Sequence, residues 1–204
     1  MMPETTDKTR DPAAAGALAR LLEALGPEGK RPGLPPVERW NPAYCGEIDM
    51  RIAADGTWHY MGTPINRPAL VKLFSTVLRR DPERYVLVTP VERVGIEVED
   101  VPFLAVEMAV EGDGDSRQIA FRTNVDDLAQ VGPEHPLRFD QDANGGVRPY
   151  VKVRGELWAR VTRALALDLI ALGEEKDVDG VVTFGVAASG MFFHIAPVSE
   201  LGVP

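Results

Sequence analysis

The first strong pattern in the chain is an alternation of apolar and polar residues over residues 48–53. Ile48, Met50 and Ile52 share one side of this alternation, which has the period of a half-buried β-strand. Asp55-Gly56 then has the composition of a tight turn, and the residues from Trp58 onward continue as the returning strand. The sequence therefore predicts a β-hairpin centred on residues 55 and 56.

A helical period follows this hairpin. Apolar residues recur at intervals of three and four at Leu70, Leu73, Phe74, Val77 and Leu78. This spacing predicts a helix with one apolar face. Arg79 and Arg80 would lie in its last turn, where positive charge is favourable, and Asp81-Pro82 would end it.

Four short strands are predicted next, at residues 85–89, 94–98, 103–110 and 118–123. An acidic loop at residues 112–115 precedes the last of them. Short strands in direct succession, joined by hairpin-sized loops, favour an antiparallel sheet rather than alternating strand–helix–strand units. We expect the helix to cover one face of this sheet.

A looser copy of the same order appears after residue 136. Leu137 and Phe139 begin an alternation, Asn144-Gly145 supplies a turn, and a returning strand leads into a helix over residues 156–172. In this alignment Trp158 takes the place of Leu70. An acidic loop over residues 174–180 and a hairpin of residues 181–187 and 191–195 complete the chain.

The predicted fold class is α+β, with two repeated motifs that each pack an antiparallel sheet against one main helix. Residues 1–36 form a tail, a short N-terminal helix over residues 13–25 and a Pro-rich linker. The helix begins after Asp11-Pro12 and ends before Gly26. We expect the two repeats at residues 37–116 and 117–204.

The composition of the 204 residues is ordinary for a globular protein, with 45% hydrophobic and 26% charged residues. A formal charge of −9 argues against nucleic acid as a partner. Cys45 is the one cysteine, so an intrachain disulfide is impossible. No apolar stretch reaches the length of a membrane span, which predicts a cytoplasmic protein.

Six segments of the chain resemble the bacterial proteins classed as domain of unknown function 1285. These segments are Cys45-Gly46-Glu47-Ile48-Asp49-Met50, Asp55-Gly56-Thr57-Trp58, Gly62-Thr63-Pro64-Ile65-Asn66-Arg67, Val88-Thr89-Pro90-Val91-Glu92, Phe121-Arg122-Thr123-Asn124 and His135-Pro136-Leu137-Arg138. The resemblance covers roughly Trp40 to Leu172. It implies two repeated α+β motifs and a ligand-sensing or signal-transduction role, and it supplies no functional residues.

The richest polar constellation lies between the two predicted repeats. The candidate ligand-binding residues are Arg67, Glu92, Asn124, Asp126, His135 and Arg138. Guanidinium groups match carboxylate and phosphate, so an anionic or polar small molecule would bind in a cleft where the repeats meet. The alternative is structural, because Asn124 with Asp126-Asp127 can begin a short helix through Leu128 and Ala129.

Catalytic patterns are weak throughout the chain. Cys45 could form a dyad with His59, His135 or His194 only if the fold brought the two together. The histidines have no metal-binding spacing, and the acids at residues 111–115 depart from a calcium loop, with Ser116 at the position that needs glycine. Ser189-Gly190 lacks the preceding glycine of a hydrolase elbow. The sequence predicts no cofactor and no metal.

The expected function is therefore a non-enzymatic regulatory protein that responds to a ligand or interacts with a protein partner. One alternative is a small-molecule enzyme of hydrolase type, with His135 as base beside Asp126 or Glu92. Another is a structural module that assembles through a sheet edge or through the helix at residues 13–25.

Overall fold

The computed structural model describes residues 33–141 and 145–201. The chain divides into two compact units: an N-terminal unit that comprises the residues up to Arg51 and Trp58–Glu97, and a C-terminal unit that comprises Ile52–Thr57 and the residues from Val98 onward. The predicted helix at residues 13–25 lies outside the described residues, as does Asn144 of the second predicted turn.

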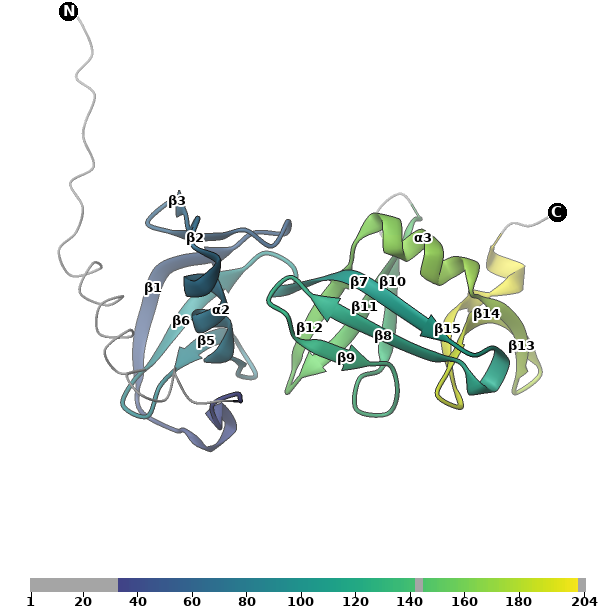
Figure 1. Ribbon diagram of the computed structural model, residues 1–204, viewed down its shortest axis with the longest axis horizontal. Helices are drawn as coiled ribbons and strands as arrows, with labels where there is room; N and C mark the ends of the chain where they lie inside the picture. The colour runs from purple at the N-terminus through teal and green to yellow at the C-terminus, as the bar shows by residue number, and fades with distance from the viewer. Residues whose placement is uncertain (1–32, 142–144, 202–204) are drawn as a thin grey trace, which may run out of the picture. The chain divides into compact units, whose positions relative to one another are not determined.

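The N-terminal unit is built on a six-stranded sheet with the strand order β3-β2-β1-β6-β5-β4. Its elements in chain order are η2 (Val37–Arg39), β1 (Tyr44–Ile52), β2 (Trp58–Tyr60), β3 (Thr63–Pro64), α2 (Pro68–Thr76), β4 (Leu78–Arg80), β5 (Tyr85–Val88) and β6 (Arg93–Val98) (Figure 1). Met50, Ile52 and Trp58 are almost completely buried, and the Trp58 ring stacks on Phe74 of α2 at 6.3 Å. Burying such large side chains stabilises the unit by about 2–3 kcal/mol each.

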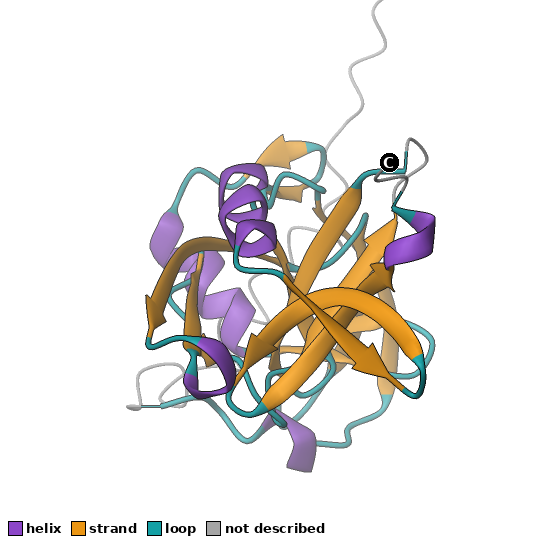
Figure 2. Ribbon diagram, turned by 90° about the vertical axis from the view of Figure 1, so that its right-hand side faces the viewer, coloured by secondary structure: helices purple, strands orange, loops and turns teal. Residues whose placement is uncertain are grey.

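The C-terminal unit contains a second six-stranded sheet, in the order β10-β11-β12-β7-β8-β9, and a three-stranded sheet, β13-β14-β15. The strands of the larger sheet are β7 (Phe103–Glu111), β8 (Gln118–Thr123), β9 (Leu128–Gln130), β10 (Leu137–Gln141), β11 (Val147–Arg154) and β12 (Leu157–Val161). The remaining elements are η3 (Gly114–Ser116), α3 (Arg163–Ala171), β13 (Glu174–Val178), β14 (Val181–Ala188), β15 (Met191–Pro197) and η4 (Val198–Glu200). Figure 2 shows the strands of this unit as a strongly curved array with α3 along one side.

The prediction of an α+β fold made of two helix-on-sheet repeats is wrong. The structure is mostly β, and among the described residues it has only two α-helices, α2 and α3, of 9 residues each. A helix of this length is marginal by itself. The strands and their cross-strand contacts therefore carry most of the architecture.

The second predicted helix, over residues 156–172, is confirmed in its later part, where residues 163–171 form α3, and is wrong in its first part. Residues 157–161 form β12, in which Leu157, Ala159 and Val161 are buried while Trp158 and Arg160 are less so. This is the alternation of a strand. Leu, Ala and Arg are good helix formers, so the sequence predicts a helix here. Pairing with β11 and β7 overrides this helix propensity. The alignment of Trp158 with Leu70 fails for the same reason.

Three smaller predictions are wrong in the same way, because each assigns a helix or a loop to a segment that forms a strand. Arg79 and Arg80 belong to β4 rather than to a last helical turn, and residues 174–178 form β13 rather than a loop. The short helix predicted through Leu128 and Ala129 is the strand β9. In each case, hydrogen bonding to a neighbouring strand determines the conformation of a short polar segment.

The predictions of short strands in direct succession are confirmed. β5, β6, β7 and β8 lie where the sequence places them, and β14 and β15 form the expected hairpin around Ser189-Gly190. The turn at Asp55-Gly56 is also confirmed, with Gly56 at a φ of 83°.

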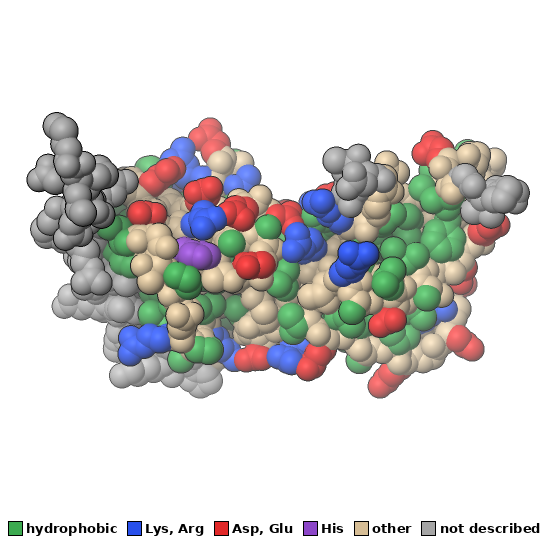
Figure 3. All heavy atoms as spheres, turned by 90° about the horizontal axis from the view of Figure 1, so that it is seen from above, with side chains coloured by type: hydrophobic (Ala, Val, Ile, Leu, Met, Phe, Trp, Pro, Cys, Tyr) green, Lys and Arg blue, Asp and Glu red, His purple; other side chains and the backbone are tan. Residues whose placement is uncertain are grey.

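On the face drawn in Figure 3, Lys and Arg side chains form a group on the C-terminal unit.

Candidate functional site

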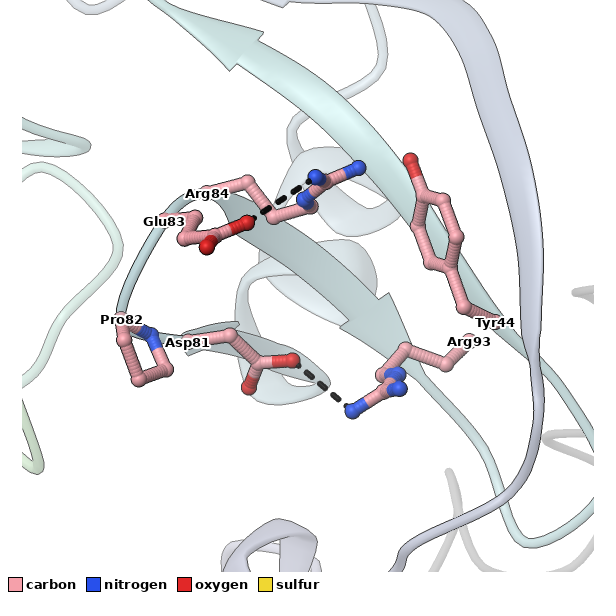
Figure 4. Close-up of a pocket in the computed structure, with 6 residues that line it drawn as sticks. All are labelled: Tyr44, Asp81, Pro82, Glu83, Arg84 and Arg93. Atoms are coloured by element: carbon pink, nitrogen blue, oxygen red, sulfur yellow. Dashed lines mark hydrogen bonds and ion pairs between the residues drawn. The ribbon is translucent and has the colours of Figure 1, made fainter.

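A pocket of about 310 Å³ lies in the N-terminal unit, beside the turn that joins β4 to β5. It is lined by Tyr44, Asp81, Pro82, Glu83, Arg84 and Arg93 (Figure 4). Its volume is at the lower end of the range for small-molecule sites. The lining places two guanidinium groups beside one aromatic ring.

The turn itself is closed by two backbone hydrogen bonds. The Asp81 amide donates to the Arg84 carbonyl oxygen at 2.9 Å, and the Arg84 amide donates back at 3.3 Å. Pro82 occupies the second position of this turn, where its fixed φ is favourable. The hairpin therefore presents the acid of Asp81 and the guanidinium of Arg84 at one end of β4 and β5.

Tyr44 reaches the pocket from the first residue of β1. Its hydroxyl lies close to Gly95 of β6, where a Cβ atom would stand 2.7 Å from the oxygen. A real Cβ could not occupy that position, so glycine is what allows the tyrosine to lie across β6. The ring then faces Arg84, whose Cζ is 4.7 Å from the ring centroid, and Arg93, whose Cζ is 6.0 Å from it.

Asp81 holds two arginines at once. Its Oδ1 accepts from Nε of Arg79 at 2.8 Å, and its Oδ2 accepts from Nη1 of Arg93 at 3.0 Å. Arg79 is buried and also donates to the carbonyl oxygens of Val37 and Trp40 at 2.8 and 2.7 Å. The Asp81 carboxylate is therefore committed to the protein, while the Nε atom of Arg93 is buried without a hydrogen-bond partner among the described residues.

Arg84 is held differently. Its nitrogens lie 3.4 Å from Glu83 and 3.8 Å from Glu47, and those two acids keep 83% and 73% of their side-chain surface exposed. Ion pairs of this kind contribute little and exchange readily with solvent. The adjacent Tyr44 side chain raises the pKa of Arg84, so the Arg84 guanidinium stays protonated and positively charged. Arg84 can therefore release its exposed partners in favour of a better acceptor.

This arrangement is suited to recognising an oxyanion. A guanidinium presents paired N–H donors that match carboxylate and phosphate, and Arg84 does so with its charge supported by an aromatic ring. The described residues contain no group of three or more His, Cys, Asp or Glu side chains placed to hold a metal ion.

Neither of the two predicted site residues in the N-terminal unit lines the pocket. Arg67 is exposed at the N-cap of α2, where its side chain makes no capping hydrogen bond. Glu92 lies in the turn between β5 and β6, and its backbone exchanges hydrogen bonds with Thr89. Its Oε1 atom is buried without a partner among the residues that the structure describes.

The predicted residues of the C-terminal unit are engaged by different neighbours. Asn124 accepts a hydrogen bond from the Leu104 amide at 3.0 Å, and Asp126 pairs with Arg122 at 2.8 Å. His135 places Nδ1 3.1 Å from the Lys152 carbonyl oxygen, and Arg138 pairs with Asp140 at 3.1 Å. Asn124 and Asp126 thus stabilise the turn between β8 and β9, which is a structural task.

The catalytic alternatives find little geometric support. Cys45 is exposed on β1, and its Sγ contacts the Ala43 carbonyl oxygen. His59 buries an unpartnered Nδ1 within the described part of the chain, and the exposed His194 packs edge-on against Phe192. The recorded contact of His135 is with a carbonyl oxygen rather than with a carboxylate.

The sequence does not predict the residues of the pocket, because most of them lie at positions that look like the boundary of a helix. The sequence predicts the end of a helix at Asp81-Pro82 and no role for Tyr44. The usable signal was a turn of the form Asp-Pro-Glu-Arg that follows Arg79-Arg80, since it concentrates charge at one end of a hairpin. The pairing of that turn with Tyr44 and Arg93 is a tertiary property.

In the ranges 33–141 and 145–201, the structure contains no helix that is long and apolar enough to cross a membrane.

Comparison with known proteins gives a consistent picture. The family described as domain of unknown function (DUF1285), N-terminal domain, matches residues 35–101, and the family described as protein of unknown function (DUF1285), C-terminal domain, matches residues 102–195. No curated protein matches the chain.

Two solved structures are similar to the chain. One is a DUF1285 family protein from Silicibacter pomeroyi DSS-3, with 48% identity and a TM-score of 0.81 over 90% of this chain and 98% of that one. The other is a DUF1285 family protein from Shewanella baltica OS155, with 26% identity and a TM-score of 0.48 over 61% of this chain and 91% of that one.

Proposed function

The chain belongs to the DUF1285 family, and for this member we propose a non-enzymatic, ligand-responsive function in which the N-terminal unit binds a small oxyanion. The ligand carries a carboxylate or phosphate group and occupies the pocket beside Arg84, Arg93 and Tyr44. The observation that carries the proposal is the contrast between the two arginines. Arg93 is fixed by Asp81, whereas Arg84 lies against the Tyr44 ring and pairs only with acids that are strongly exposed, Glu83 at 3.4 Å and Glu47 at 3.8 Å.

The charge balance of the pocket supports an anion as the ligand. Asp81 is neutralised by Arg79 and Arg93 together, so its negative charge does not repel an incoming group. Glu83 and Glu47 are exposed and can turn into solvent when a ligand takes their place on Arg84.

A response to the ligand follows from how Asp81 is shared. An oxyanion that draws Arg93 toward itself weakens the Arg93–Asp81 pair, and the same carboxylate positions Arg79. Arg79 in turn holds the carbonyl oxygens of Val37 and Trp40, on either side of η2. Occupancy of the pocket would therefore change how firmly the segment before β1 is held, which is the two-state element that a ligand-responsive protein requires.

Arg84→Gln tests the proposal. A thermal-shift screen of small carboxylates and phosphates against the full chain should find a ligand that raises the unfolding temperature, and Arg84→Gln should abolish most of this rise. The substitution keeps two hydrogen-bonding groups but removes the charge and the fork. It should leave the unfolding temperature of the free protein nearly unchanged, since Arg84 is partly exposed.

Arg80→Gln is the matched control. Arg80 lies in the neighbouring strand β4, and its Cζ is 4.5 Å from the Tyr85 ring centroid, so it has a similar stacking contact but does not line the pocket. Its removal should leave the ligand response intact. Equal loss in both variants would show that the screen reports net charge rather than this pocket, and an unaltered response in Arg84→Gln would refute the proposed site.

The hydrolase-type alternative with His135 as base, and the assembly-module alternative, stay predictions. Neither is supported by an observation comparable with the Arg84 geometry. For the hydrolase-type alternative, the contact of the His135 ring is with the Lys152 carbonyl oxygen.

A further inference from the structure

One face of three adjacent strands in the C-terminal unit concentrates positive charge beside two aromatic rings. In the register of β10, β11 and β12, Arg138 stands opposite Tyr150, Tyr150 opposite Arg160, and Lys152 opposite Trp158. Residues that face each other across a ladder share a side of the sheet. Leu137, Val151 and Ala159 occupy the opposite, buried side.

We call this side the cationic face; its members are Arg138, Arg148, Tyr150, Lys152, Trp158 and Arg160. Asp140 on β10 belongs to it as well, opposite Arg148. Four cations on one sheet surface stand out in a chain whose formal charge is −9.

Arg138 is the cation of this face that lies against both aromatic rings. Its Cζ lies 4.6 Å from the centroid of the Tyr150 ring and 4.8 Å from that of the Trp158 ring. Its Nε lies 3.1 Å from Oδ1 of Asp140. Tyr150 is itself fixed, because its hydroxyl donates to the Asp100 carboxylate at 3.1 Å and the residue is buried. The guanidinium is therefore held by two rings and one acid.

The outer edge of the same guanidinium is not used by the protein. Within residues 33–141 and 145–201, the contacts of the Arg138 side chain are the two rings and Asp140, and 43% of its surface is exposed. Nη1 and Nη2 thus present a preorganised pair of donors to solvent. A donor pair whose orientation is already fixed loses less conformational freedom when it binds.

Two neighbouring cations, Arg160 and Lys152, are engaged by groups of the protein. Nη1 of Arg160 contacts Asp100 at 3.2 Å, and its Nη2 donates to the Ala54 carbonyl oxygen at 2.6 Å. Lys152 pairs with Glu156, which is 66% exposed. Because each of these cations is already paired with an acid, neither competes with Arg138 for a ligand.

We propose that Arg138 is the anion-binding residue of a second ligand site, which takes a phosphate or carboxylate group on the Nη1–Nη2 edge of its guanidinium. The site lies wholly within the C-terminal unit and does not depend on the pocket at Arg84. A bound oxyanion forms two parallel hydrogen bonds with the fork. Because the guanidinium lies against Trp158, binding also changes the electrostatic surroundings of that indole.

Tryptophan fluorescence provides a direct test, with inorganic phosphate as the ligand and the full chain as the protein. Phosphate should change the emission in a saturable manner in the millimolar range, whereas sodium chloride at equal ionic strength should not. The titration is made in the Arg84→Gln background, so that binding in the other pocket cannot contribute. Trp158→Phe should remove the optical change while phosphate still raises the unfolding temperature.

Arg138→Gln should weaken phosphate binding by about tenfold or more, because the charge and the fork are lost together. Arg148→Gln is the matched control, since it removes the same charge from the same face, at the position opposite Asp140 and two residues before Tyr150 on β11. It should weaken binding by less than about threefold.

Three results would overturn the site. The first is an equal loss of binding in Arg138→Gln and Arg148→Gln, which would mean that the face attracts anions without a defined position. The second is an emission change that persists in Arg138→Gln, and the third is a response that does not saturate or that chloride reproduces. If Arg138→Gln lowers the unfolding temperature of the free protein, Arg138→Lys separates folding from recognition: it keeps the charge, and weakened binding is still expected because the planar fork is absent.

Discussion

At the scale of single residues, Gly95 determines whether Tyr44 can line the pocket. The tyrosine hydroxyl and Cγ of Glu47 would lie 2.7 and 3.0 Å from a Cβ at this position. Both neighbours are side chains at the exposed beginning of β1, so they can move aside at moderate cost. The residue therefore matters for the shape of the site more than for the stability of the fold.

Gly95→Ala is expected to lower the free energy of unfolding by about 1–2 kcal/mol, near the lower end of the cost of overpacking. It should also weaken ligand binding at Arg84, because a displaced Tyr44 no longer supports the guanidinium. Urea denaturation and a ligand titration measure the two effects.

Gly132→Ala is the control for Gly95→Ala. There a Cβ would approach no atom closer than 3.8 Å, so we expect a change within about 0.5 kcal/mol. Full binding by Gly95→Ala would contradict the role given to Tyr44.

At the scale of elements, the short strand β4 links the pocket to the segment before β1. Its middle residue, Arg79, is buried and bonds both the Asp81 carboxylate and two backbone carbonyl oxygens. In a helix, as the sequence predicts, the same side chain would point into solvent beside the helix terminus. In the strand it turns inward, because alternate residues of a strand face opposite sides of the sheet.

Arg79→Met should destabilise the protein by about 2–4 kcal/mol. The substitution leaves the carbonyl oxygens of Val37 and Trp40 without this donor, and Asp81 keeps only Arg93. Chemical denaturation gives the loss in stability, and limited proteolysis should show faster cleavage near residues 37–43.

Arg80→Met provides the comparison for Arg79→Met, because this neighbour on the same strand has its main contact with the Tyr85 ring. Its cost should remain below about 1 kcal/mol. Similar costs for the two substitutions would argue against Arg79 as the anchor of the segment before β1.

At the scale of the whole molecule, the two units are interleaved along the chain. Residues 52–57 lie between two segments of the N-terminal unit in sequence but belong to the C-terminal unit. Arg160 donates to the Ala54 carbonyl oxygen, and a Cβ on Gly56 would stand 3.0 Å from Cδ1 of Leu104 and 3.1 Å from Nδ2 of Asn124. The turn that closes the first hairpin is thus a packing element of the second unit.

Gly56→Ala should therefore destabilise the C-terminal unit, although the residue lies in a hairpin of the N-terminal segment. A positive φ of 83° and the close contacts together predict a loss of about 1–3 kcal/mol. Hydrogen exchange should show reduced protection in β7 and β8, whereas β4 and β5 should be little affected.

Gly62→Ala separates the two contributions to the cost of Gly56→Ala. Gly62 has a similar φ of 71°, but a Cβ there would meet nothing within 4 Å. Its effect should be smaller and confined to the N-terminal unit. Reduced protection in β4 and β5, rather than in β7 and β8, after Gly56→Ala would contradict the assignment of residues 52–57 to the C-terminal unit.

The candidate sites were only partly predictable. Arginine as the anion-recognising residue follows from its chemistry, and the sequence predicts Arg138 as such a residue, but nothing in the linear pattern pairs it with Tyr150 and Trp158. The Arg84 pocket was missed because its residues come from β1, the β4–β5 turn and β6. Asn124 and Asp126, which looked like ligand-binding groups, are engaged by Leu104 and Arg122 within the unit.

The sequence by itself determined the short strands rich in apolar residues and the turns whose glycines need a positive φ, because both are local properties. β5 to β8, the β14–β15 hairpin and the Asp55-Gly56 turn are of this kind. Only the tertiary structure decided that residues 157–161 are a strand, that residues 52–57 pack in the C-terminal unit, and that Arg84 meets Tyr44. These depend on contacts between residues far apart in the chain, where pairing with a neighbouring strand outweighs local propensity.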